Sequence, residues 1–494
     1  MSKIVLFFIL ISIISCSTIE TKNDYRVSKE VVVTGRILNS NLQKDQVRVI
    51  AENLGLDSDR YYPEVDHEGF FKVTFQTYLP QDSRFSYGNV NFLFLAFPGD
   101  SIHIEYDARN KEGVLDAITF SGDRAESNKK VVKFQVMTNY NNAAYSKEVS
   151  QAKKELDPIA FSKLMDSVHA SQLQIYNDFI KEEQPNETVK SWAFHNCQEP
   201  YNYAMFRYSS EYGTGNDVHV PLEFYDFQTK YLPLKEKELI SANYLGQFLN
   251  QFGGGYIRER ILKEYEQEIK DTPESLDWGS IYINEIIKYT KDPLLKQLLL
   301  TAVISEKLGM KDISIYEDHV ALISKNITKP YLIKPLREKY VVVKKELQNP
   351  KLASDALFLE MEGTDVASKI NSIRSINKGK IIYFDFWGPN CKPCVAEMPH
   401  SKRLMETLKG KDVAFVYLCI NSDTNKAKAK LSELQLGGQH YFFNKKQSVE
   451  LQKIFKVQGV PRYMLINQEG VLIDQNAKRP SDPKLKEELL ELLS

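Results

Sequence analysis

Two cysteines three positions apart are the residues of this sequence best suited to chemistry. They lie in the segment Cys391-Lys392-Pro393-Cys394, and a helical pattern begins directly behind the first of them. At a helix N-terminus, unpaired amide N–H groups and the helix dipole favour a thiolate, and a cysteine one turn later is close enough to close a disulfide. We therefore predict a redox-active dithiol in which Cys391 is the nucleophile and Cys394 the resolving thiol.

A zinc site is the alternative use of two cysteines at this spacing. Zinc needs about four protein ligands, but the sequence has five cysteines in all, no second pair at this spacing, and only His400 nearby. We therefore expect no metal. Five cysteines are also too few for a disulfide-stapled scaffold, so Cys197 and Cys419 are expected to be buried structural thiols.

Alternating strands and helices surround the dithiol over residues 353–494. An apolar strand precedes the cysteines, a helical pattern follows them and stops at Gly410, and a second buried strand comes next. Further elements are expected at 427–434 (helix), 441–443 (strand), 449–455 (helix), 463–466 and 471–473 (strands that flank a turn) and 484–493 (helix). This order predicts an α/β domain that holds the cysteines at a helix start.

The order of elements resembles the thioredoxin fold with an N-terminal extension. The cysteine motif is similar to that of the TlpA/ResA-type thioredoxins, because Cys391, Cys394, Glu397 and Pro399 reproduce their Cys-x-x-Cys-x-x-Glu-x-Pro pattern. The resemblance implies a thiol-disulfide oxidoreductase without a cofactor, in which Glu397 tunes the cysteine pair and Pro399 kinks the helix. Asn390 departs from the family, which usually has Trp before the first cysteine, so an aromatic docking surface of the family is lost.

The resemblance also implies roles for residues around the cysteines. Asp385 and Trp387 precede them at the thioredoxin spacing, where the Asp lies buried behind the second cysteine and the Trp packs beside the site as part of the substrate-binding surface. A buried carboxyl with a raised pKa can accept the proton of Cys394. Val460-Pro461 stands where thioredoxins have a cis-proline, which presents the preceding backbone to a substrate chain.

An apolar run at the N-terminus indicates export. Residues Ile4 to Ile14 follow Lys3 and lead to Ser15-Cys16. Eleven helical residues span about 17 Å, well short of the ~30 Å hydrocarbon core, so the run fits a signal peptide better than a membrane span. Its end resembles the bacterial lipobox, which implies a lipoprotein signal peptide over 1–16, lipidation of Cys16 and a tether over 17–30. The expected location is the envelope of a Gram-negative-type bacterium, lipid-anchored, periplasm-facing and at the outer membrane.

Two further regions lie between the tether and the dithiol domain. Residues 31–122 show alternating apolar positions, such as Phe71, Val73 and Phe75, and turn signals that predict an antiparallel β-sandwich domain. Residues 123–350 show helical spacing throughout and predict an all-α domain. Within that domain we expect Gly253-Gly254-Gly255 to break two helices as a flexible turn.

The composition excludes some partners and leaves two classes of function. A net charge of −1 provides no global basic field for nucleic acid. The expected partners are exported proteins with disulfides, a membrane thiol electron donor, and the membrane through the lipid anchor. The family includes reductases of cytochrome c maturation, which implies that role as one possibility. The alternative is an envelope binding protein whose large first regions recognise a partner while the thioredoxin-like domain senses redox state. A copper or zinc carrier is a third, weaker hypothesis.

Overall fold

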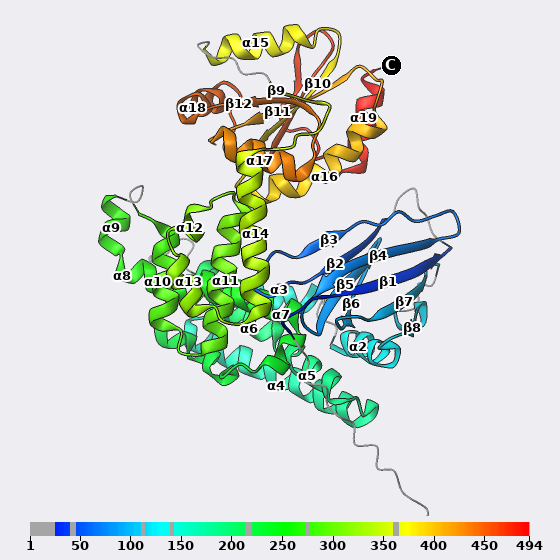
Figure 1. Cartoon of the computed structure of the whole chain (residues 1–494), viewed down its shortest axis with the longest axis vertical. Helices are drawn as coiled ribbons and strands as arrows, with labels where there is room; N and C mark the ends of the chain where they lie inside the picture. The colour runs from blue at the N-terminus through cyan, green and yellow to red at the C-terminus, as the bar shows by residue number, and fades with distance from the viewer. Residues whose placement is uncertain are drawn as a thin grey trace, which may run out of the picture.

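The protein consists of three regions in chain order (Figure 1), seen in a computed structural model. The structure describes residues 25–39, 46–109, 114–138, 143–212, 220–272, 276–358, 365–421 and 423–493. The expected signal peptide and Cys16 lie outside the described residues. Among the helices in these ranges, none is both long and apolar enough to cross a membrane.

Two four-stranded sheets form the N-terminal region and enclose one apolar core between them. Their strand orders are β4-β1-β7-β8 and β3-β2-β5-β6. The prediction that all strands are antiparallel is wrong for one pair, because β1 and β7 run parallel; the chain passes through the second sheet before it returns. The strands are β1 (Lys29–Leu38), β2 (Val47–Ala51), β3 (Asp59–Tyr61), β4 (Phe70–Thr77), β5 (Gln81–Tyr87), β6 (Val90–Ala96), β7 (Ser101–Asp107) and β8 (Ile118–Gly122).

Helix α2 (Ala125–Thr138) covers the edge of the second sheet. The side chain of Asn128 accepts a hydrogen bond from the Leu95 N–H at 2.6 Å and donates one to the Leu95 carbonyl at 3.2 Å. Gln135 forms the same pair of bonds with the backbone of Leu93. Because edge strands carry unpaired backbone groups that invite aggregation, these two amides complete the edge that β6 would otherwise expose.

The middle region is helical and is joined to the sheets through a buried carboxylate. Asp82 on β5 accepts hydrogen bonds from the Trp192 indole and from the Asn243 backbone N–H, both at 2.8 Å. The helices of the middle region are α3 (Ala143–Glu155), α4 (Pro158–Glu183), α5 (Glu187–Asn196), α6 (Glu199–Tyr212), α7 (Ala242–Phe252), α8 (Arg258–Glu264), α9 (Glu266–Asp271), α10 (Trp278–Tyr289), α11 (Pro293–Gly309), α12 (Ser314–Glu317), α13 (Val320–Asn326) and α14 (Pro330–Gln348), with the 3₁₀ helices η1 (Leu222–Tyr231) and η2 (Glu236–Ile240). The short helix α1 (Val114–Ala117) belongs to the N-terminal region, between β7 and β8.

The triple glycine does not break the helices. Gly253–Ile257 forms a π-helical segment, η3, that runs from α7 directly into α8, so the predicted flexible turn is wrong. Gly255 packs against Phe206 and Tyr225, where a Cβ would lie 3.3 Å from the Phe206 ring. The glycines therefore permit close packing within a continuous helix, which residue type alone does not distinguish from a turn.

The C-terminal region is a mixed six-stranded sheet with helices on both faces. Its strand order is β14-β13-β10-β11-β12-β9, with β10 parallel to β11 and antiparallel to β13. Figure 1 shows α14 leading from the helical region to this domain. The elements are β9 (Ala356–Phe358), α15 (Val366–Ile376), β10 (Ile381–Trp387), α16 (Lys392–Thr407), β11 (Val413–Cys419), α17 (Thr424–Leu434), β12 (Gly438–Phe442), α18 (Lys445–Ile454), β13 (Arg462–Ile466), β14 (Leu472–Asp474) and α19 (Pro483–Glu491).

The central strand β10 is buried on both faces. Its side chains point alternately into two apolar cores, one on each side of the sheet. Tyr383 and Trp387 belong to the core that contains Cys394 and the inner face of α16. Phe384 and Phe386 belong to the opposite core, beneath α15 and α18. Since side chains alternate along a strand, Asp385 shares the face of Tyr383 and Trp387 and points into the layer of the dithiol helix.

Candidate active site

The dithiol lies at the start of α16, as the sequence predicts. Cys391 is the N-cap, with φ −83° and ψ 93°, and its sulfur accepts a hydrogen bond from the Cys394 backbone N–H at 3.2 Å. The two residues form a disulfide whose Cα atoms are 5.2 Å apart. Pro393 occupies the first turn, where its missing N–H costs nothing because the first amides of a helix have no intrahelical acceptor.

The two sulfurs differ in access. Cys394 is 1% exposed, whereas Cys391 is partly exposed at the surface. An incoming thiolate or disulfide can reach Cys391 but not Cys394. The helix N-terminus also favours negative charge on Cys391, since its amide dipoles point there. The arrangement therefore supports attack by Cys391 and release by Cys394.

Asp385 is a buried carboxyl in the same layer. It is 1% exposed, and neither of its oxygens has a hydrogen-bond partner among the protein atoms of the described ranges. Burial raises the pKa of Asp385 well above its ordinary value, and the nearby Glu397 carboxylate raises this pKa further. A carboxyl with a raised pKa is a stronger proton acceptor in its ionised form, so Asp385 gives the layer beneath α16 a group that can take up a proton.

Glu397 lies one turn beyond Cys394 on α16 and is 9% exposed. Its two oxygens accept hydrogen bonds from Ser481, one from the backbone N–H at 3.0 Å and one from the hydroxyl at 2.9 Å. The carboxylate is therefore fixed in position near Asp385. Sequence reasoning missed Ser481, because it lies 84 residues from its partner and belongs to no motif.

Trp387 and the proline segment occupy different parts of the site. The Trp387 side chain is fully buried in the core that contains Cys394, so the expectation that it contacts substrate is corrected: it supports the site from within. The Val460–Pro461 peptide bond is cis, and both residues are partly exposed just before β13. Val460, Pro461 and Cys391 thus remain accessible where Trp387 does not. Pro399 lies inside α16.

Lys392 makes a contact that the sequence did not reveal. Its ammonium group lies 2.5 Å from a carboxylate oxygen of Glu306 on α11, in the helical region. Glu306 therefore offsets the Lys392 charge, which would otherwise help to stabilise the neighbouring Cys391 thiolate. Asn390, which replaces the family's Trp, is exposed.

The other described cysteines are structural. Cys197 and Cys419 are buried and do not form disulfides. Burial raises the pKa of the Cys197 thiol to about 12, and its sulfur donates a hydrogen bond to the Phe194 carbonyl at 3.0 Å. Within the described ranges, no group of three or more His, Cys, Asp or Glu residues is arranged to hold a metal ion.

The region that contains the two cysteines is similar to known proteins. A thioredoxin-like family model matches residues 379–472. The thiol-disulfide oxidoreductase ResA of Bacillus thuringiensis subsp. konkukian is 27% identical over 126 residues, which cover 26% of this chain and 70% of ResA. ResA of Bacillus anthracis is 31% identical over 115 residues, which cover 23% of this chain and 62% of ResA.

Solved structures also resemble part of the chain. The thioredoxin domain of a thiol-disulfide oxidoreductase from Bacteroides vulgatus is 18% identical and matches 24% of this chain and 84% of its own length, with a TM-score of 0.23. The residues that the family model matches include Cys391 and Cys394, the cis Val460–Pro461 bond and the central strand β10. The family model and the ResA relatives together show that the chain carries a thioredoxin-like domain similar to that of thiol-disulfide oxidoreductases.

Proposed function

We propose that the protein is a lipid-anchored reductase that acts outside the cytoplasm on disulfides of exported proteins. The observation that carries this proposal is the cysteine pair at the N-terminus of α16, with Cys391 accessible and Cys394 buried. In the reaction, the Cys391 thiolate attacks a substrate disulfide and releases one substrate thiolate. Cys394 then attacks Cys391 and releases the second. Two electrons pass to the substrate, and a membrane thiol donor restores the dithiol by the reverse exchange.

The proposed substrates include the paired cysteines of apocytochrome c, which must be reduced before haem attachment. The similarity to ResA and the TlpA/ResA-type motif support this choice. A substrate of this kind offers a short disulfide loop in an unfolded chain, which an accessible Cys391 beside Val460–Pro461 can approach. The direction of electron flow is part of the proposal.

Measured exchange tests this proposal. The fully reduced whole chain should transfer two electrons to an oxidised Cys-x-x-Cys-His peptide, with one protein disulfide formed per peptide reduced, and Cys391→Ser should transfer none. A reductase should have a potential nearer to the about −270 mV of thioredoxin than to the about −120 mV of DsbA. A potential close to the DsbA value would contradict the reductase direction, and a wild type without exchange would contradict the enzyme itself.

Lipidation of Cys16 is the proposed anchor. Mass spectrometry of the mature N-terminus should find an acylated Cys16 preceded by no residue. Cys16→Ala should move the protein from the membrane fraction to the soluble fraction, because one acyl chain is already marginal for stable anchoring and the variant has none. Ser17→Ala, which keeps the cysteine, should remain in the membrane fraction. A wild type found in the soluble fraction would contradict the anchor.

A further inference from the structure

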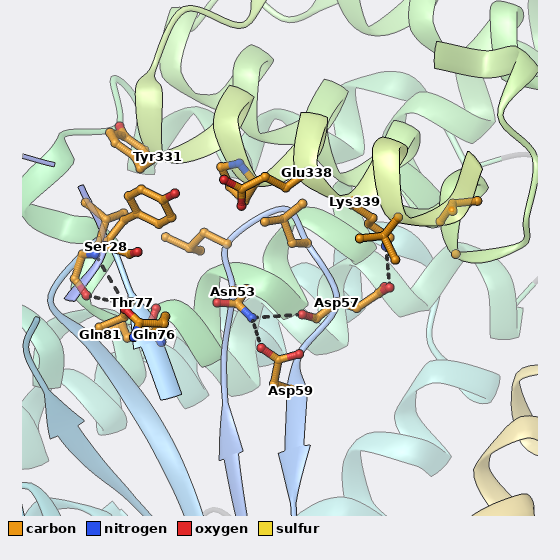
Figure 2. Close-up of a pocket in the computed structure, with 18 of the residues that line it drawn as sticks. Ser28, Asn53, Asp57, Asp59, Gln76, Thr77, Gln81, Tyr331, Glu338 and Lys339 are labelled. Atoms are coloured by element: carbon orange, nitrogen blue, oxygen red, sulfur yellow. Dashed lines mark hydrogen bonds and ion pairs between the residues drawn. The ribbon is translucent and has the colours of Figure 1, made fainter. Parts of the chain in front are cut away.

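A cavity of about 580 Å³ opens where all three regions of the chain meet. The N-terminal region contributes loop and strand residues such as Asn53, Asp59 and Gln81, the helical region contributes α14 and the end of α11, and the C-terminal domain contributes Glu433 on α17. Figure 2 shows Glu338 and Lys339 on one side of this cavity and Asn53, Asp57 and Asp59 on the other. The volume lies within the range of about 300–1,000 Å³ typical of ligand pockets.

The walls of the cavity combine apolar surface with an excess of negative charge. Five carboxylates and two lysines line it, an excess of three negative charges. Lys339 pairs with Asp57 at 2.5 Å, and the buried Lys311 pairs with Glu346 and Glu433, both at 2.6 Å. The apolar part of the wall comprises Leu54, Leu56, Tyr78, Leu79, Val342 and Val343.

Glu338 and Gln81 are the polar groups best placed to contact a ligand. Glu338 is exposed on the cavity wall near Tyr78, where its carboxylate can meet a cation. Gln81 is 3% exposed, and its side-chain N–H group has no partner among the residues that the structure describes. A buried donor without an acceptor costs free energy comparable to a lost hydrogen bond, so an acceptor on a bound molecule would relieve this cost. A bound peptide would pair a basic side chain with Glu338, a backbone carbonyl with the Gln81 amide, and apolar side chains with the apolar wall.

Helix α11 links the cavity to the helix that begins at the dithiol. Gly309 lines it at the end of α11, and Glu306, three residues earlier on the same helix, holds Lys392 beside Cys391. One helical turn spans about 5.4 Å. On α16 itself, the Arg403 guanidinium lies 5.6 Å from the centre of the Tyr62 ring in the N-terminal region. A peptide of five or six extended residues spans about 17–20 Å, which is the length that we assign to the segment between the substrate disulfide and the cavity.

We propose that this cavity binds an extended segment of the disulfide-bearing substrate, with a basic side chain at Glu338 and apolar side chains against the Leu54 and Val342 walls, while the disulfide lies against Cys391. The proposal rests on the proposed reductase function and adds its substrate preference. Cys391 and then Cys394 attack as in the proposed reaction, and two electrons pass from the dithiol to the substrate disulfide. The first two regions of the chain select the substrate that the third reduces.

Matched peptides test this preference on the whole chain. Each peptide carries one oxidised Cys-x-x-Cys loop flanked five residues away on both sides by Lys-Leu, or by Glu-Leu in its partner. The reduced wild type should react with the Lys peptide about tenfold faster than with the Glu peptide. Glu338→Lys should reverse or abolish this ratio. Glu268→Lys, an equal charge change on an exposed residue of α9, should preserve it.

A second variant removes space instead of charge. Val342→Trp, from an exposed position on the cavity wall, should slow exchange with both peptides. Reaction of the wild type with bis(2-hydroxyethyl) disulfide reports the dithiol alone. If that reaction occurs while the peptide ratio is unchanged in Glu338→Lys and the rates are unchanged in Val342→Trp, the cavity inference is overturned and the reductase stands. If the reaction itself fails, the proposed function is overturned.

Discussion

Cys394→Ser is expected to accumulate covalent adducts with substrate proteins, where the wild type accumulates almost none. Cys391 still attacks the substrate disulfide, but the mixed disulfide can be released only by the resolving thiol. The other described cysteines, Cys197 and Cys419, are buried, so we expect neither of them to replace Cys394 in this step. Non-reducing electrophoresis of cell extracts should show the adducts, and added reductant should remove them.

The remaining cysteines provide the controls for this experiment. Cys391→Ser and the double Ser variant should form almost no adducts, since Cys197 and Cys419 are buried. Adducts that contain apocytochromes would support the maturation role, whereas a wider set of secreted enzymes would support a general reductase. Equal adducts from both single variants would show that the assignment of the nucleophile is wrong.

Local sequence was sufficient to predict the start of the dithiol helix. A cysteine at the N-cap, a proline in the first turn and an apolar strand before them specify their structure within a few residues, and α16 begins at Lys392 accordingly. Continuous apolar runs likewise predicted β10 and β11. The helical class of the middle region and the β class of the N-terminal region could also be predicted, because the apolar periodicity of a helix or a strand depends on residues that are close in sequence.

Contacts between distant segments could not be predicted in this way. Glu306 pairs with Lys392 across 86 residues, and Asp82 bonds to Asn243 across 161. The parallel pairing of β1 with β7 is equally remote, since strand direction depends on the path of the intervening chain. These contacts decide which regions face the dithiol, so the cavity beside it was also beyond sequence reasoning.

Asp385→Asn is expected to slow disulfide exchange near neutral pH by about 10²-fold, within the about 10²–10⁴ range of general acid–base groups. Asp385 lies in the buried layer beneath α16, and its carboxyl is the group proposed to take the proton of Cys394 when that thiol attacks. The amide has a similar shape but cannot accept this proton. Stopped-flow rates between pH 6 and 9 should show the deficit, and Asp412→Asn, an exposed acid in the same domain, should show none.

A stability measurement separates this role from a structural one. Because the folded pKa of Asp385 is raised above its unfolded value near 3.8, the carboxyl contributes stability that is complete below the unfolded pKa and is lost as pH rises through the folded pKa. Asp385→Asn removes this loss, so the free energy of unfolding of the variant should rise relative to the wild type as pH increases from the unfolded pKa near 3.8 to the raised folded pKa. A variant that gains stability with pH and exchanges slowly supports proton transfer by Asp385. One that gains stability but exchanges at the wild-type rate throughout pH 6–9 would leave Asp385 as a buried acid without a part in the reaction.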